Sequence, residues 1–291
     1  ARQKVCVTPV CSSATFCTMT TSFGLIIVGD EILSGKRQDK HLPKVIELLS
    51  ARGLALSYAD YVGDDPTRIT RALERAFASG DTVFSTGGIG ATPDDQTRQS
   101  AARALGVPLQ GHPEAQALIR ERMEGIAQER GEVYDPSSPD NLHRLNMGVF
   151  PVGARIIPNS YNKIPGFSCT GSAGGSVHFV PGFPVMAWPM IEWVLDHHCA
   201  DFFNRAPQTE RSVLVFGAME AALTPLMVQV EQMHPGVRVF SLPSVDHPQH
   251  GRHIELGVKG PAAAVPAAWS ALKSGLLTVG ANLGPELVRN L

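Results

Sequence analysis

Acidic side chains follow three apolar segments, each of which is predicted to be a strand. The acids are Asp30 and Glu31, Asp64 and Asp65, and Asp94 and Asp95. Carboxylates gathered at one sheet edge repel one another and any phosphate, so they imply a counter-ion or a ligand rich in N–H donors. Mg²⁺ bridging carboxylates and phosphates is one such arrangement, and a pterin or purine edge bound to an Asp is another. We therefore expect a phosphate-bearing ligand that contains a ring; the other interpretation is acids on a solvated rim.

The third acidic pair ends a glycine-rich segment, GGIGATPDD, at residues 87–95. Its glycines let the backbone approach a ligand closely, and a helix N-terminus after it offers free N–H groups. A purely structural interpretation is also open. Thr92 would cap the helix, Pro93 would take its first position, and Asp94 and Asp95 would complement its dipole. That interpretation leaves the acids at the other two strand ends unexplained.

The spacing of apolar residues around these acids predicts alternating strands and helices. Residues 24–28 form a continuous apolar run, which is typical of a strand buried on both faces. Further strands are predicted at 54–62 and 81–86, with helices over 41–52, 65–77, 94–105 and 114–130. Short loops between alternating elements indicate a parallel sheet, and such sheets bind ligands beyond the carboxyl ends of their strands.

The rest of the sequence predicts an irregular section and then a second, smaller domain. Residues 131–182 read as an irregular section with short strands at 154–157 and 177–180, followed by a helix over 186–203. Beyond Pro207 the predicted order is β-α-β-β-α, with strands at 211–216, 237–242 and 253–258 and helices over 219–233 and up to 276. We expect a disordered leader (1–20), an α/β domain (21–205) and a small α+β domain (206–291).

Five motifs, in order along the chain, resemble one known family. GDEILSG (29–35), VGDD (62–65) and GGIGATPDDQT (87–97) look like the molybdopterin-binding, MoaB/Mog-type fold. Within it they are most similar to the N-terminal domain of the competence/damage-inducible CinA family. PNSYNKIPGF (158–167) resembles that family's Asn-rich loop, and VPGFP (180–184) its turn into a helix. The resemblance implies a three-layer, mostly parallel sheet followed by a small α+β domain.

The resemblance also implies an activity. In molybdopterin enzymes the acids that match Asp64 and Asp95 handle the pterin dithiolene, and the glycine-rich loop lies against phosphate. In the CinA branch the pocket is associated with Mg²⁺-dependent cleavage of a nucleotide pyrophosphate such as ADP-ribose, and a similar domain of FAD synthases with FAD hydrolysis. We expect a metal-dependent nucleotide pyrophosphatase with Asp64, Asp95 and Lys163 as catalytic residues. Lys163, in a Gly- and Asn-rich loop, would bind the diphosphate, unless it is simply a solvated loop lysine.

The expected site is completed by metal ligands and ligand contacts. Mg²⁺ or another divalent ion would be held by Asp30, Asp64 and Asp95. The pterin or nucleotide, with molybdopterin itself a candidate, would contact Gly29, Asp30, Glu31, Asp39, Gly87, Gly88, Gly90, Thr92, Asp94, Thr97, Asn162, Pro181 and Gly182.

Two other readings of the chain stay open. It could be a non-catalytic module that binds molybdopterin or serves molybdenum-cofactor biosynthesis; acids at three strand ends favour an enzyme, because hydrolysis needs at least two carboxylates for a metal. It could also be a scaffold, and we expect a homo-oligomer in every case. His247, His250 and His253 are spaced as metal ligands can be. They fall in a predicted hairpin, where that spacing need not bring the rings together, so we do not expect a zinc site.

Composition narrows the class of protein. Lys and Arg number 25 against 27 Asp and Glu, a net charge of −2, which argues against a nucleic-acid or polybasic membrane surface. No apolar run reaches the roughly 18 residues of a membrane span, and we see no signal peptide. Three of the five cysteines lie in the first 17 residues, a poor disulfide framework. These features predict a cytoplasmic globular protein.

Overall fold

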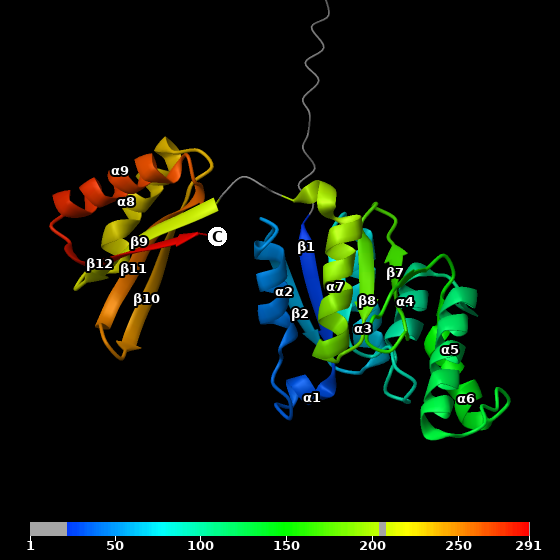
Figure 1. The fold of residues 1–291 in the computed structure, drawn as a ribbon. Coiled ribbons are helices and arrows are strands. Elements are labelled where there is room, and N and C mark those ends of the chain that lie inside the picture. Colours follow the sequence, from blue (N-terminus) through cyan, green and yellow to red (C-terminus); the bar gives the residue numbers. More distant parts are fainter. Residues whose placement is uncertain (1–21, 204–207, 291) are drawn as a thin grey trace, which may run out of the picture.

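The computed structural model of the chain describes residues 22–203 and 208–290 (Figure 1). The expected disordered leader, residues 1–20, lies outside the described residues. Within the described ranges, no helix combines the length and the apolar character that crossing a bilayer requires.

A six-stranded sheet organises the first part. Its strands are β1 (Phe23–Val28), β2 (Leu56–Val62), β3 (Thr82–Thr86), β6 (Arg155–Ile157), β7 (Gly166–Thr170) and β8 (Ser176–Val180), in the order β2-β1-β3-β8-β7-β6. The pairs from β2 to β8 are parallel, and β7 pairs antiparallel with both β8 and β6. The expectation of a mostly parallel sheet is therefore confirmed.

Helices cover both faces of this sheet, which makes three layers (Figure 1). In β1, Leu25 and Ile27 pack with residues of α2 (His41–Ser50) and α7 (Pro184–His198). Ile26 and Val28 pack on the other side, with α3 (Pro66–Ala78), α4 (Thr97–Leu105) and α5 (Pro113–Arg130). Alternate side chains of one strand enter two cores, which is why the strand has no polar face.

The start of α4 corrects one prediction. The helix begins at Thr97, three residues later than expected, with Gln96 at the N-cap. Before it, the Asp95 carboxylate accepts hydrogen bonds from both the N–H and the hydroxyl of Thr92. This closes a separate turn, so the interpretation of Thr92 as the helix cap and Pro93 as the first helical residue is wrong.

The section 131–182 is more ordered than its composition indicates. The two predicted strands correspond to β6 and β8. The sequence missed α6 (Pro139–Arg144), a 3₁₀ turn (Leu145–Gly148), β7, and β5 (Val149–Pro151), which pairs with β4 (Leu109–Gly111). It also missed the short α1 (Asp30–Leu33). These elements are three to six residues long, too short to show a periodicity, and the strands among them also depend on pairing with other segments.

The C-terminal part is an antiparallel sheet with two helices. Its elements are β9 (Gln208–Phe216), α8 (Glu220–Met233), β10 (Arg238–His247), β11 (Gly251–Pro261), α9 (Val265–Thr278) and β12 (Asn282–Asn290). The strand order β10-β11-β9-β12 with β-α-β-β-α-β connectivity is the split βαβ arrangement. The sequence missed β12, an edge strand whose Gly284 and Pro285 coincide with a register shift.

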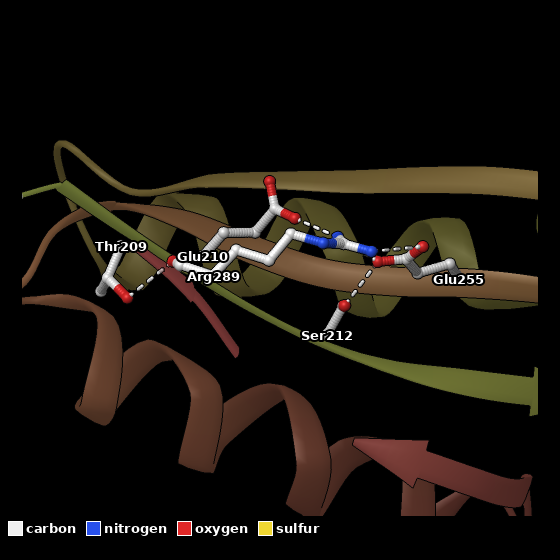
Figure 2. Close-up of polar contacts among 5 residues, drawn as sticks. All are labelled: Thr209, Glu210, Ser212, Glu255 and Arg289. Atoms are coloured by element: carbon white, nitrogen blue, oxygen red, sulfur yellow. Dashed lines mark hydrogen bonds and ion pairs between the residues drawn. The ribbon is translucent and has the colours of Figure 1, made fainter. Parts of the chain in front are cut away.

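Arg289 ties the edge strand β12 to the two strands beyond it (Figure 2). Its guanidinium pairs with Glu210 of β9 and with Glu255 of β11, which also accepts a hydrogen bond from the Ser212 hydroxyl. The hydrogen bonds that Arg289 donates to these two carboxylates raise its pKa. One side chain thereby spans three neighbouring strands.

His178 of β8 is a buried titratable group in the core, 2% exposed. Its Nδ1 lies 2.7 Å from the Ser168 hydroxyl and its Nε2 2.8 Å from the Ser176 hydroxyl. Burial, with smaller effects from His198 and Arg155, lowers the pKa of His178 from 6.5 to about 3. The folded protein therefore holds this ring neutral at pH values where the unfolded chain protonates it.

The free energy of unfolding should consequently fall as the pH drops from about 6.5 towards 3, because only the unfolded state binds this proton. We expect His178→Gln, which hydrogen-bonds without titrating, to remove up to ~1.4 kcal/mol per pH unit of that slope. Urea unfolding between pH 4 and 7 measures it. His197→Gln, at an exposed ring, should keep the wild-type slope. Equal slopes in all three proteins would contradict the assignment.

Candidate functional site

The loops that follow β1, β2, β3 and β8 meet at one edge of the sheet. The Gly29 N–H donates to the Val62 carbonyl over 3.0 Å, and the Gly87 N–H donates to the Val180 carbonyl over 3.0 Å. Gly87 has a left-handed φ of 93°, and a Cβ there would lie 2.3 Å from the Val28 carbonyl oxygen. The glycine is therefore required by both conformation and space.

A cavity of about 390 Å³ opens beside these loops. Three segments form its wall: the glycine-rich loop, the Asn-rich loop and the turn into α7. Its lining residues are Gly88, Ile89, Gly90, Ala91, Thr92, Asp95, Met147, Asn159, Asn162, Ile164, Pro165, Pro181, Gly182, Phe183 and Met186. Six expected ligand contacts are among them, Gly88, Gly90, Thr92, Asn162, Pro181 and Gly182, together with Asp95, expected as a catalytic residue and metal ligand. We call this space the ligand cavity.

Asn159 holds the Asn-rich loop in shape. The side chain is 6% exposed, and its Nδ2 donates to the Asn162 Oδ1 over 2.8 Å and to the Ile164 carbonyl over 2.9 Å. The Asn159 Oδ1 accepts from the Tyr161 N–H over 3.0 Å. The loop is thus braced internally, with Asn162 in the cavity wall.

A hydrogen bond from α2 holds the turn into α7. The Nε2 of His41, a side chain 5% exposed, lies 3.0 Å from the Gly182 carbonyl and donates to it. Phe183 is the N-cap residue of α7 and Pro184 its first residue. Phe183 lines the cavity and yet is 56% exposed, so its ring offers an unfilled apolar face to a ligand.

Asp30 and Asp64 form a reciprocal pair at the ends of β1 and β2. The Asp30 N–H donates to the Asp64 Oδ2 over 2.9 Å, and the Asp64 N–H donates to the Asp30 Oδ1 over 3.2 Å. Burial raises the pKa of Asp64 against the opposing effect of that backbone hydrogen bond, and the carboxylates of Asp30, Glu31 and Asp94 raise it further. Four acids therefore share one region at this edge of the sheet, whereas Asp95 lines the ligand cavity.

Two expected ligand contacts are structural. Asp39 caps α2, accepting from the N–H groups of His41 and Leu42, and also from the Tyr61 hydroxyl over 2.8 Å. Thr97 is fully buried; its hydroxyl donates to the Gly87 carbonyl and its N–H donates to the Gly88 carbonyl. Both shape the loops and lie outside the lining of the ligand cavity.

Lys163 lies outside the cavity lining as well. Its Nζ is 2.6 Å from the Glu121 carboxylate, and its backbone has a φ of 64°. No group of three His, Cys, Asp or Glu side chains in the described ranges is placed to hold a metal, so Asp30, Asp64 and Asp95 do not form a three-carboxylate centre. The structure joins Asp30 with Asp64 and leaves Asp95 bound to Thr92.

The histidines of the β10–β11 hairpin do approach one another. The ring centroids of His247, His250 and His253 are separated by 4.9, 5.3 and 6.0 Å. The His247 Nδ1 accepts the N–H of His250 over 3.2 Å, and the His253 Nδ1 donates to the Gly251 carbonyl over 2.9 Å. The rings pack together without forming a metal-binding group in the described structure.

Comparison with known proteins agrees with this geometry. The profile of the family described as "Probable molybdopterin binding domain" matches residues 24–200. This chain belongs to that family. It is 34% identical to a CinA-like protein of Desulfovibrio desulfuricans over 168 residues, 58% of this chain and 37% of that protein. It is 31% identical to a protein of Pyrobaculum calidifontis over 258 residues, 88% of this chain and 94% of that protein.

A solved structure extends the comparison to the fold. The crystal structure of CinA from Thermoplasma acidophilum, a protein described as of unknown function, has a TM-score of 0.52 and 26% identity, and covers 63% of this chain and 100% of its own. The chain spans 37–40% of the length of the first CinA-like relatives. Its first part is thus a member of the probable molybdopterin binding domain family and is similar to CinA-like proteins.

Sequence reasoning missed part of the cavity wall. Asn159 and Phe183 lie inside the motifs that carried the resemblance, yet neither was singled out. Met147 and Met186 carry no local signal, because apolar residues at helical positions are usually core. The one sequence signal available for Phe183 is an aromatic residue directly after Pro181 and Gly182.

The close approach of Gly87 to β1 gives a direct test. Gly87→Ala should lower the free energy of unfolding by ~2–4 kcal/mol, through left-handed strain and a clash with the Val28 carbonyl. Gly35→Ala is the matched control: its φ is 72°, but a Cβ there meets nothing within 4 Å. Gly35→Ala should lower the free energy of unfolding by only ~1 kcal/mol. Urea unfolding of both variants measures the difference, and equal losses would show that the contact is unimportant.

Proposed function

We propose that this chain binds a ring-bearing nucleotide or pterin that carries a diphosphate, and hydrolyses the pyrophosphate bond with the help of a divalent ion. The ring lies in the ligand cavity, and the diphosphate extends towards the acids after β1 and β2. The observation that carries the proposal is the reciprocal pair of Asp30 and Asp64 at the ends of β1 and β2, where burial and neighbouring carboxylates raise the pKa of Asp64.

The cavity wall suits an aromatic ring. Apolar side chains such as Ile89, Ile164 and Met186 surround it, and the exposed face of Phe183 is available for stacking. The Asp95 carboxylate and the Asn162 amide are polar groups in the same wall. A carboxylate accepts hydrogen bonds from ring N–H groups, which both pterins and purines present.

The acid pair suits Mg²⁺ shared with a substrate. Mg²⁺ in proteins is often held by one or two carboxylates together with substrate phosphates and water. In both Asp30 and Asp64, one carboxylate oxygen accepts the backbone N–H of the other residue. The second oxygen of each is available for such an ion. When bound, the ion neutralises phosphate oxygens and activates a water. Asp64, with its raised pKa, is the better placed of the two to accept a proton from that water.

A second candidate is binding without turnover. Among the described lining residues there is no Lys or Arg, and Lys163 is paired with Glu121. Positively charged side chains usually stabilise the charge that develops during phosphoryl-group cleavage. This arrangement favours a molybdopterin-binding module as the alternative function.

The test is turnover of ADP-ribose and FAD with Mg²⁺ or with EDTA, in wild type and two adjacent variants. Asp64→Asn should lower the Mg²⁺-dependent rate by ~10²–10⁴-fold, the usual effect of losing a general base. Asp65→Asn is the control, because Asp65 caps α3 through the Arg68 N–H and Asn caps a helix equally well. It should stay within a few-fold of wild type.

The other results separate the two candidates. Ring-bearing nucleotides or molybdopterin that bind without any turnover would replace the hydrolase by the binding module. Equal activity in Asp64→Asn and wild type would remove the acid cluster from the mechanism. If neither class of ligand binds, the ligand cavity is not the site.

A further inference from the structure

A second cavity, of about 300 Å³, adjoins the ligand cavity. The two share Ala91 and Thr92, so the same loop separates them. The second cavity is otherwise lined by the first turn of α4 and by the segment around α6, including Gln96, Arg98, Gln99, His143 and Asn146. We call it the α4 cavity.

Arg98 is a buried cation in the wall of this cavity. Its side chain is 5% exposed, and its Nη2 donates to the Gly90 carbonyl. Its Nε is buried without a hydrogen-bond partner, and no described carboxylate lies within ion-pair distance of it. Burial lowers the pKa of Arg98, against a weaker opposing effect of Asp95. A buried charge without an ionic partner is costly, so this position favours binding of an anion.

The start of α4 adds further donors. No side chain caps this nine-residue helix. The Thr97 N–H donates to the Gly88 carbonyl, whereas the N–H groups of Arg98 and Gln99 donate to no described residue. Free N–H groups and the helix dipole favour an anion there. The Oε1 of Gln99 is also buried without a partner, and a protonated phosphate oxygen would satisfy it.

We propose that the α4 cavity is an oxyanion site that takes a phosphate group. The Arg98 guanidinium and the first N–H groups of α4 are its donors. Asp95, the nearest acid, lies in the wall of the ligand cavity instead and is engaged by Thr92. The phosphate is either a free ion or a phosphate group of the molecule bound in the ligand cavity, whose diphosphate would then extend towards α4 and not towards Asp30 and Asp64. The site is separate from the acid pair Asp30 and Asp64 and does not depend on hydrolysis.

The probe is inorganic phosphate, titrated calorimetrically into the full chain in EDTA at constant ionic strength. We expect Arg98→Met to weaken phosphate binding at least tenfold. Arg103→Met is the matched control: it removes an exposed arginine of the same helix, one that contacts Thr70 and Ser100 outside the cavity. It should bind phosphate within twofold of wild type.

A second variant covers the possibility that Arg98→Met fails to fold. Asn146→Phe leaves Arg98 intact and puts a larger apolar side chain into the cavity wall, so it should also weaken phosphate binding at least tenfold. Absence of phosphate binding by wild type, or equal affinity in the folded variants and the control, would overturn the proposal. Because no pyrophosphate is present, a failure of the hydrolase test leaves this one standing.

Repeating the titration with saturating ADP-ribose distinguishes the two sources. Competition would show that the site takes a phosphate group of the nucleotide. Independent binding of both would show a free phosphate ion. Both results depend on Arg98 if the proposal is right.

Discussion

The contact between Gly87 and the carbonyl of Val28 sets the position of everything else at the site. It brings the loop after β3 against the end of β1 at a distance that only a glycine allows. Thr97 then holds the same loop from the other side, through the carbonyls of Gly87 and Gly88. The glycine-rich segment is therefore fixed between a strand and a helix before any ligand arrives.

Acids of one chemical type have different tasks around this loop because their surroundings differ. Asp39 caps α2 with both carboxylate oxygens engaged, whereas Asp65 and Asp95 each use one oxygen, on the Arg68 N–H and on Thr92. Burial raises the pKa of Asp64, and the carboxylates around it raise it further. Composition counts all of these as one acidic cluster, whereas their hydrogen-bond partners and surroundings differ from one acid to the next.

The sequence predicted the architecture well and the site in part. A continuous apolar run identified β1, and the motif order identified the family and the edge where loops converge. It did not locate α4 correctly, because the same Thr-x-x-Asp spacing serves a helix cap or an isolated turn. It placed Lys163 at the ligand, where the structure pairs that side chain with Glu121, 42 residues earlier. It passed over Arg98, since the burial of an arginine depends on tertiary packing.

The direction of β7 has a consequence for the entropy of binding. In the six-stranded sheet of the described chain, β7 runs against its neighbours, so the Asn-rich loop joins two hydrogen-bonded strands as a hairpin. Its ends are held close together, and Asn159 braces its interior. A wall built this way has little conformational freedom left to lose when a ligand arrives. Folding itself orders this side of the cavity, so ligand binding does not carry the conformational entropy cost of ordering it.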